Sequence, residues 1–233
     1  MKNAAVFQLH AVALLALCAQ PLFGGVVLDG SFGTHGALPG PNFMISANLG
    51  RQVGSNLFQS FSQFNLISSQ SAAFTGPANV QNILSRVTSG SPSSIDGRVS
   101  SQIQGANLFF LNPAGVMFGQ HAQIDVSGSF AVSSANYVKL ADGGRFNTSL
   151  GGNDMLTSAP VSAFGFLNAM PASVSIAGST LNIAPQKSFS DVAGDIRING
   201  GKIRGGGSRV NLVSVKSSGE VAPIHPTSIA QSM

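Results

Sequence analysis

The sequence predicts an all-β protein in which short strands stack as a solenoid. Runs with apolar side chains two positions apart recur after residue 26, and turn residues separate them. Two of these runs, Val174–Ile176 and Ile196–Ile198, begin 22 residues apart (174 to 196). A repeat length in the twenties with several short strands is typical of β-solenoids, whose coils bury their inward side chains against one another.

The composition excludes several other classes of protein. Charged residues make up 9% of the 233 residues, against about 25% in typical soluble domains, so a helical bundle would lack charged residues for its exposed faces. The hydrophobic share of 43% excludes a charge-rich disordered chain. The 28 Gly and 11 Pro favour many tight turns. The net charge is only +4 and the basic residues are scattered, so nucleic-acid binding is not expected.

The N-terminus has the composition of a signal peptide. Lys2 is followed by an apolar run over residues 11–19, and Pro21 ends the run. The run is too short to span a bilayer, and its length and basic start match a secretory leader. We therefore expect residues 1–25 to be a signal peptide that directs the chain to the Sec translocon.

Two other interpretations of the N-terminal segment stay open. Leu15–Cys18 resembles a lipoprotein box, although Leu17 occupies a position where a small residue is needed. The apolar run is also compatible with an N-terminal core helix, although no amphipathic pattern accompanies it. Cys18 is the only cysteine and lies within the leader, so the mature chain is expected to have no disulfide.

Each alternating run predicts a strand with one face in a core and the other in solvent. Gly and Asn residues between the runs allow the chain to turn corners, where a positive φ is often required. The same runs are also compatible with a β-sandwich of hairpins, with turns at Asp142-Gly143 and Asn199-Gly200. The predicted strands include Ile124–Val126, Phe130–Val132, Val174–Ile176, Leu181–Ile183, Ile196–Ile198, Val210–Leu212 and Val213–Val215.

Residues 51–87 have a less regular pattern. Phe58, Phe61 and Phe64 are three positions apart, which fits either helical turns or a strand with bulges. Residues 80–87 have helical spacing and predict a short helix. Because the end of a solenoid leaves unpaired strand edges, we expect this stretch to form a cap over one end.

The sequence contains no recognisable catalytic or metal-binding motif. None of the four histidines, His10, His35, His121 and His225, has a partner at metal-ligand spacing, so we expect surface histidines and no metal site. The run 205–207 of three glycines lacks the lysine and the following helix of a phosphate-binding loop, and it predicts a coil corner. No cofactor is expected.

A carbohydrate-active β-helix enzyme would need a pair of carboxylates. Asp191 and Asp195 are the closest acidic pair, but Asp195 lies between Gly194 and the start of a strand, which is typical of a turn residue. The chain also has one Tyr and no Trp, so few side chains could stack on sugars. We therefore do not expect catalysis.

Two motifs in the first half of the chain are more specific than any periodicity. Residues 112–116 read Asn-Pro-Ala-Gly-Val after a short apolar strand, and residues 61–65 read Phe-Ser-Gln-Phe-Asn. They resemble the Asn-Pro-Asn-Gly-Ile and Phe-x-x-Phe-Asn motifs of the N-terminal secretion (TPS) domain of filamentous haemagglutinin-like exoproteins. Ala114 and Val116 depart from the family pattern. The motif residues are Asn112, Pro113, Ala114, Gly115 and Val116 with Phe61, Gln63, Phe64 and Asn65.

The resemblance covers residues 26–221 and implies both a fold and a partner. The implied fold is a right-handed parallel β-helix with capping strands. The implied partner is an outer-membrane β-barrel transporter with periplasmic POTRA domains, which passes the exoprotein unfolded to the cell surface of a Gram-negative-type bacterium. In the first motif Pro fixes φ, Gly tolerates positive φ and Asn can bond to the backbone two residues on, so the motif is also a tight turn. Shaping a coil and binding the transporter both remain open as its role.

The resemblance also suggests how the chain is divided. We expect a signal peptide at 1–25, a secretion domain with cap and first coils at 26–170, further coils at 171–221, and an irregular tail at 222–233 left by truncation or a frameshift. The expected function is the secretion-targeting module of an adhesin-like exoprotein. A β-helix carbohydrate-active enzyme and a small secreted matrix protein are the alternatives.

Overall fold

The structure is a computed structural model that describes residues 24–222. The predicted signal peptide up to residue 23 and the predicted tail from residue 223 lie outside these residues. The described part contains 23 strands and one short 3-10 helix, η1 (Ala47–Leu49). None of its helices has the length and apolar character needed to cross a membrane.

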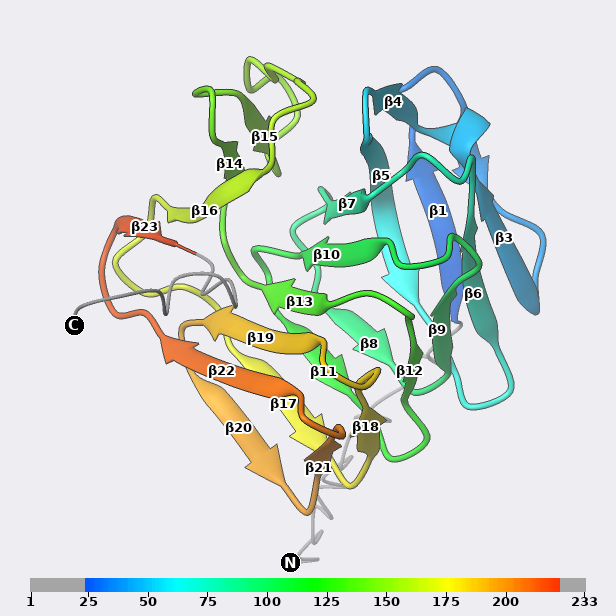
Figure 1. Ribbon diagram of the computed structural model, residues 1–233, viewed down its shortest axis with the longest axis vertical. Coiled ribbons are helices and arrows are strands. Elements are labelled where there is room, and N and C mark those ends of the chain that lie inside the picture. Colours follow the sequence, from blue (N-terminus) through cyan, green and yellow to red (C-terminus); the bar gives the residue numbers. More distant parts are fainter. Residues whose placement is uncertain (1–23, 223–233) are drawn as a thin grey trace, which may run out of the picture.

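One long sheet takes a strand from each successive coil (Figure 1). Its order is β2-β1-β5-β7-β10-β13-β19-β22, with β4 also paired to β5. From β5 to β22 all neighbours are parallel, because the chain returns to this sheet after passing through the other faces of the coil. The strands are β1 (Gly25–Asp29), β2 (His35–Ala37), β4 (Arg51–Val53), β5 (Asn56–Asn65), β7 (Asn82–Val87), β10 (Asn107–Leu111), β13 (Phe130–Ser133), β19 (Ser188–Ala193) and β22 (Arg209–Ser214).

Shorter parallel sheets form the other two faces of the coils. The chain passes from β7 to β8 to β9, and from β10 to β11 to β12, visiting the faces in the same order each time. The second face has the order β20-β17-β11-β8, and the third has β12-β9-β6-β3 with the pair β18-β21. The bounds are β3 (Asn42–Ser46), β6 (Ser71–Thr75), β8 (Ser93–Ile95), β9 (Arg98–Ser101), β11 (Val116–Phe118), β12 (Gln123–Asp125), β17 (Val174–Ala177), β18 (Thr180–Asn182), β20 (Ile196–Asn199) and β21 (Lys202–Arg204).

The predicted all-β solenoid is therefore confirmed. Val174 pairs with Ile196 in adjacent parallel strands, so the 22-residue spacing is the length of one coil. Gly200 has φ +66 at the corner between β20 and β21. The β-sandwich alternative, with a hairpin turn at Asn199-Gly200, is wrong.

The cap at the N-terminal end consists of strands rather than a helix. β1 and β4 both pair antiparallel with β5, and β2 pairs antiparallel with β1. The predicted helix over residues 80–87 is wrong, because residues 82–87 form β7, a parallel strand of the long sheet. Of the stretch 51–87 only β4 belongs to the cap, while β5, β6 and β7 are strands of the coils themselves.

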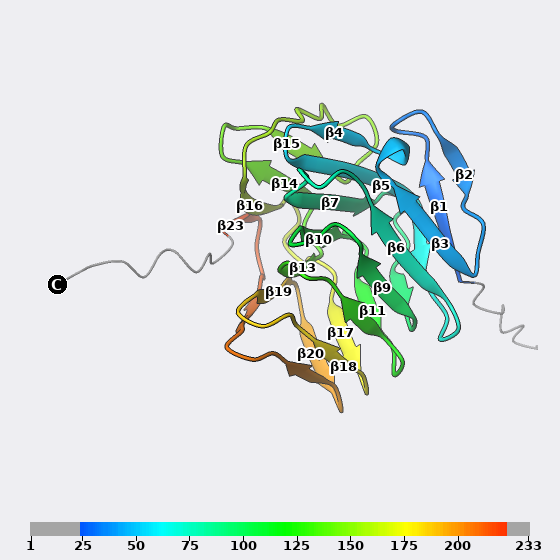
Figure 2. The same ribbon diagram turned by 45° about the vertical axis from the view of Figure 1, so that its right-hand side comes forward.

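A small antiparallel sheet interrupts the solenoid between β13 and β17 (Figure 2). Asp142-Gly143 does form a hairpin turn in this sheet, with φ +91 at Gly143. The sheet covers the outer face of the long sheet, where Phe58, Leu84 and Phe109 pack against Phe146 and Phe164 in a second apolar cluster. Its strands are β14 (Tyr137–Leu140), β15 (Arg145–Asn147), β16 (Val161–Phe166) and β23 (Gly219–Val221).

The main core lies inside the coils and is rich in phenylalanine. Phe64 packs edge-to-face on Phe110 with ring centroids 5.0 Å apart, and Phe118 packs on Phe130 at 6.2 Å. Both inward and outward faces of the long sheet are thus buried, which gives its central strands near-continuous burial.

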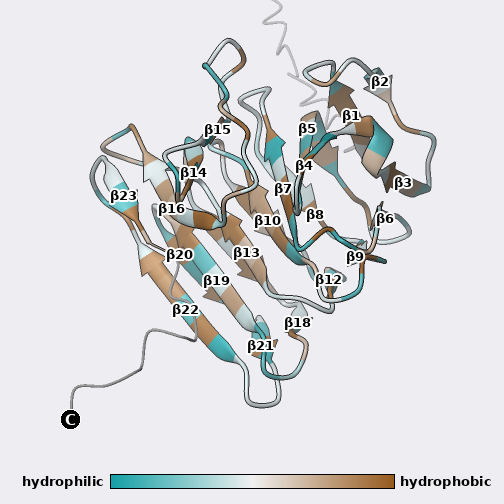
Figure 3. Ribbon diagram, turned by 45° about the horizontal axis from the view of Figure 1, so that its top comes forward, coloured by the Kyte–Doolittle hydropathy of each residue, from teal (hydrophilic) through white to brown (hydrophobic). Residues whose placement is uncertain are grey.

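The opposite end of the solenoid is uncovered within residues 24–222. β20, β21 and β22 each lie at the edge of a sheet. Val210 and Leu212 align with the buried Phe189 and Asp191 of the preceding coil, yet both are 46% exposed. Figure 3 shows hydrophobic segments on β22 at this end. The predicted burial of one face therefore fails for Val210–Leu212, because no further described coil covers it.

A ladder of three asparagines joins successive coils. The Asn82 amide donates to Asn56 Oδ1 at 2.9 Å, and the Asn107 amide donates to Asn82 Oδ1 at 3.0 Å. The Asn56 amide donates to the carbonyls of Thr157 and Ala159, which ties the ladder to the antiparallel sheet. Each side chain therefore serves as both donor and acceptor.

We expect Asn82→Ala to lower the free energy of unfolding by about 2 kcal/mol, because it removes partners from Asn56 Oδ1 and from the Asn107 amide. Urea denaturation measures the loss. Asn153→Ala, on an exposed loop, is the control and should change stability little. An equal effect of both substitutions would contradict a structural role for the ladder.

Candidate functional site

The Asn-Pro-Ala-Gly-Val motif is the corner between β10 and β11. Asn112 is fully buried, and its amide donates to the Ser91 carbonyl and to Ser93 Oγ, both at 3.0 Å. Its Oδ1 accepts a 3.0 Å hydrogen bond from the Ala114 N–H. The side chain therefore shapes its own turn and also ties that turn to the corner of the preceding coil.

Glycine is required at position 115 of this turn. Gly115 has φ +103, a conformation that L side chains rarely adopt. A Cβ there would lie 2.6 Å from the Ser173 carbonyl oxygen of the following coil. Pro113 and Ala114 are half-buried, and Val116 is buried.

The Phe-Ser-Gln-Phe-Asn motif ends strand β5. Phe61 and Phe64 are both in the core, with ring centroids 5.3 Å apart. A spacing of three would normally place them on opposite faces of a strand. The register with β1 shifts so that Val27 faces Gln63 and Leu28 faces Phe61, which leaves Ser62 as an extra residue. This bulge turns both rings inward, and of the two structures proposed for Phe58–Phe64 the bulged strand is confirmed.

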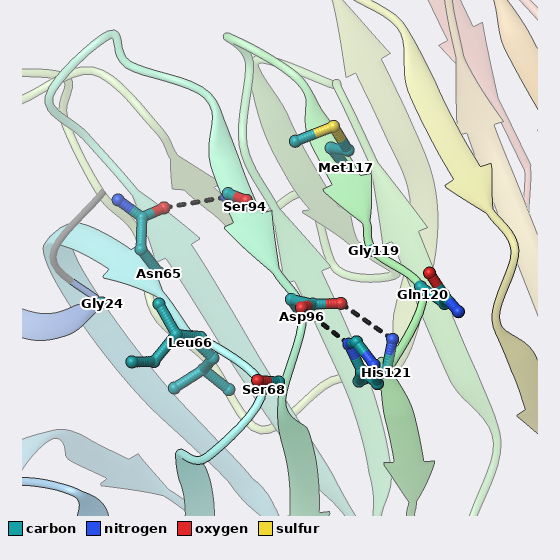
Figure 4. A pocket seen from close by; sticks show the side chains of 11 residues that line it. Gly24, Asn65, Leu66, Ser68, Ser94, Asp96, Met117, Gly119, Gln120 and His121 are labelled. Atoms are coloured by element: carbon teal, nitrogen blue, oxygen red, sulfur yellow. Dashed lines mark hydrogen bonds and ion pairs between the residues drawn. The ribbon is translucent and has the colours of Figure 1, made fainter. Parts of the chain in front are cut away.

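The two motifs meet at β8, although 47 positions separate Asn65 from Asn112 (65 to 112). Asn65 Oδ1 accepts a 2.8 Å hydrogen bond from the Ser94 N–H (Figure 4). Asn112 donates to the carbonyl of Ser91, which precedes β8, and to Oγ of Ser93, the first residue of β8. The two asparagines thus hold one strand of the coil between them.

Two hollows open on the outer face of this strand. One, of about 400 Å³, is lined by Asn65 and by side chains of the next two coils, and the other, of about 470 Å³, includes Ala114 and Gly115. They share Ser94 and Met117, and Met117 is 45% exposed. Sequence reasoning did not identify Met117, although its place between the inward-pointing residues Val116 and Phe118 marks it as outward-facing.

Asp96 and His121 form a pair at the edge of the first hollow (Figure 4). Asp96 Oδ1 accepts a 2.8 Å hydrogen bond from the His121 N–H, and its other oxygen lies 3.0 Å from the ring Nδ1. Burial by itself would raise the pKa of Asp96, but the His121 hydrogen bonds hold it below its usual value. No group of three or more metal-ligating side chains occurs among residues 24–222.

Asp191 and Asp195 do not form an exposed carboxylate pair. Asp191 is completely buried, neither of its oxygens has a hydrogen-bond partner, and burial raises its pKa to about 7. Asp195 is exposed beside Lys216 and Arg197, and the Lys216 contact is the main cause of its lowered pKa. Because Asp191 is closed off from solvent, the two side chains cannot flank a sugar bond.

The comparisons with known proteins identify the family of the chain. No curated protein matches the chain. The family model of the TPS secretion domain matches residues 26–229, most of the chain and both motifs. The chain therefore belongs to the TPS secretion domain family, a family of two-partner secretion exoprotein modules.

Proposed function

We propose that this chain is the secretion-targeting module of an adhesin-like exoprotein. In this proposal the leader directs it through the Sec translocon, and an outer-membrane β-barrel transporter recognises it through periplasmic POTRA domains. The module then folds at the cell surface, and no catalytic step is assigned to it. Membership of the TPS secretion domain family supports the assignment to two-partner secretion.

The burial of the motif residues is the observation that carries the proposal furthest. Phe61 and Asn112 are 0% exposed, Phe64 is 1% and Val116 is 2%. A receptor therefore has no access to these side chains once the coils have formed. Recognition of the motifs is expected to act on the unfolded chain, in which the same side chains are available.

A physical mechanism follows from the same burial. The backbone of an unfolded segment can add a strand to a sheet edge of the periplasmic receptor. Outside the cell the coils then form in order, and Asn112 closes its corner against Ser91 and Ser93. Since the buried contacts form only after release, folding opposes return of the chain.

We expect Pro113→Ala to accumulate in the periplasm when the chain is co-expressed with its transporter. Pro113 is half-buried, and its replacement leaves the Asn112 hydrogen bonds in place, so the folded state should lose little stability. Asn112→Ala should accumulate as well and should also lower the free energy of unfolding, by about 2 kcal/mol. Secreted and periplasmic fractions are quantified by immunoblot, and stability by urea denaturation.

Asn82→Ala is the control for a general loss of stability, because it weakens the coils without touching either motif. It should be exported as efficiently as the unaltered chain. Normal export of Pro113→Ala, together with equal export of Asn112→Ala and Asn82→Ala, would contradict a role of the motif in transporter recognition. The motif would then only shape the fold.

A further inference from the structure

The uncovered end of the solenoid carries an excess of positive charge. The basic residues of the last coil, 195–216, are Arg197, Lys202, Arg204, Arg209 and Lys216. Asp195 is the one acidic residue of this coil, so its formal charge is +4 (five minus one). The other described residues include six basic and seven acidic side chains, a charge of −1 (six minus seven). The charge of the described chain is therefore concentrated at one end.

The five basic residues of the last coil surround this end, and we call them the basic rim. Their strands, β20, β21 and β22, lie together there on three different faces of the coil (Figure 1). Asp195 pairs with Arg197 at 3.2 Å and also with Lys216. Lys202 and Arg204 are exposed on β21, and within residues 24–222 neither forms an ion pair with a carboxylate. One carboxylate thus neutralises only part of the rim.

The centre of the same end is apolar. Val210 and Leu212 belong to the inward row of β22, and Ile198 aligns with the buried Ile176 of the preceding coil. Val210 and Leu212 are each 46% exposed and Ile198 is 42% exposed, because no described coil covers them. The chain also turns away from this end, since β23 pairs with β16 in the antiparallel sheet.

We propose that this end of the solenoid is a docking surface for an anionic lipid bilayer. Ile198, Val210 and Leu212 would lie at the level of the headgroups, with the basic rim against the lipid phosphates. Binding of this kind increases with the apolar area buried and with the attraction to anionic lipids. The unpaired N–H groups of the edge strands would face phosphates and water. Contact therefore stays in the headgroup layer, because open sheet edges do not enter the hydrocarbon core.

The combination of charge and apolar surface favours this partner over two others. A second copy of the chain would bring two ends of charge +4 together, and their repulsion opposes an end-to-end dimer. A soluble polyanion would pair with the basic rim but would leave the apolar centre in water. An anionic membrane uses both features. The proposal goes beyond secretion, because it concerns the folded module and requires no transporter.

Co-sedimentation of the purified exported chain with vesicles tests the proposal. We expect binding to vesicles made of equal parts of phosphatidylglycerol and phosphatidylcholine, and little binding to phosphatidylcholine alone. Added NaCl should weaken the binding, since it screens the charges. Lys202→Gln combined with Arg204→Gln should lower the partition coefficient about 25-fold, or roughly fivefold for each charge removed.

Two further variants separate location from net charge and apolar contact from charge. Arg51→Gln combined with Arg98→Gln removes the same number of charges from exposed side chains on β4 and β9, and it should bind like the unaltered chain. Leu212→Ser changes no charge, and it should weaken binding several-fold at every salt concentration. Circular dichroism shows that each variant is folded.

Equal losses in the two double variants would assign the binding to net charge and overturn the docking surface. Absence of binding to the anionic vesicles would do the same. Full binding by Leu212→Ser would point to a polyanion as the partner. A dimer in analytical ultracentrifugation that Leu212→Ser converts to a monomer would point to a second copy of the chain. Since no transporter takes part, each of these results would leave the proposed function intact.

Discussion

The folded chain should lose stability as the pH rises from about 4 to 7, and Asp191→Asn should remove most of this loss. Asp191 lies inside the last coils, aligned with Val132 on one side and Leu212 on the other. Its two oxygens have no hydrogen-bond partner, so nothing in the core compensates a negative charge there. Burial therefore raises the pKa of the carboxyl from 3.8 to about 7.

The sign of the effect follows from the direction of this shift. Between the two pKa values the carboxyl is ionised in the unfolded chain and protonated in the folded one, so folding takes up a proton. Stability is fully present below pH 3.8 and falls until the folded carboxyl ionises near pH 7. One proton over this range corresponds to roughly 4 kcal/mol, at about 1.4 kcal/mol per pH unit.

Urea denaturation at several pH values measures this dependence. The difference between the unaltered chain and Asp191→Asn isolates Asp191 from other carboxyls such as Asp29 and Asp96, whose pKa values are lowered and which titrate at more acidic pH. Asp195→Asn is the control, since Asp195 is exposed near the end of the same strand, and it should keep the decline. A profile that is unchanged by Asp191→Asn would show that water or a rearrangement relieves the buried charge.

The solenoid was predictable from sequence where strands keep one face in the core. β17 buries Val174 and Ile176 and turns Ser175 outward, as its alternation predicts. β20 has the same alternation one coil later, so the spacing is visible directly, although Ile198 is 42% exposed at the uncovered end of the solenoid. β7 was predicted as a helix because its strand is buried on both faces. Ile83 and Val87 belong to the inner core and Leu84 to the outer cluster, and this two-sided burial produces an apolar spacing that resembles a helix.

The partners of the site could not be predicted because the coils differ in length. Asn56 pairs with Asn82 and Asn82 with Asn107, coils of 26 and 25 residues (82 minus 56, 107 minus 82). Phe130 pairs with Phe189, 59 residues on, because the antiparallel sheet is inserted between them. Without a constant repeat, the sequence indicates the turn chemistry of Asn112 but not its contact with Ser93.

Asp191 exposes a further limit of sequence reasoning. Its spacing from Asp195 drew attention to a possible catalytic pair, whereas the structure separates the two by burial. In the alternation of β19, Phe189, Asp191 and Ala193 share the inner face, and this pattern contained the information that Asp191 is interior. The alternation of β19 therefore predicts that the Asp191 carboxyl lies in the core, between two apolar side chains of the inner face.

We expect Arg86→Met to lower the free energy of unfolding by about 3 kcal/mol, the lower end of the range for breaking a buried ion pair. Arg86 is 3% exposed and donates to Ser60 Oγ at 2.7 Å and to Asp154 Oδ2 at 2.7 Å. It also donates to Ser31 Oγ and to the Asn147 carbonyl. One guanidinium thus joins the N-terminal cap, the long sheet and the loop that follows β15.

The contacts of Arg86 suit a guanidinium better than an ammonium. The guanidinium carbon lies 4.4 Å from the Phe146 ring centroid, a distance that allows a cation–π contact. Arg86 contacts Ser60, Asp154 and Ser31 from three different nitrogens, whereas the three donors of a lysine are all on one nitrogen and cannot reach all three partners. Arg86→Lys should therefore recover only a small part of the stability lost in Arg86→Met.

Urea denaturation measures the global loss, and limited proteolysis reports on the loop at residues 148–154, which should be cleaved faster in Arg86→Met. Arg98→Met is the matched control, because Arg98 also pairs with an aspartate, Asp125, but both side chains are more than half exposed. A surface pair of this kind contributes less than about 1 kcal/mol. If both substitutions cost the same, burial does not strengthen the Arg86 network, and the inserted sheet is held to the coils by its apolar cluster and by the Asn56 hydrogen bonds.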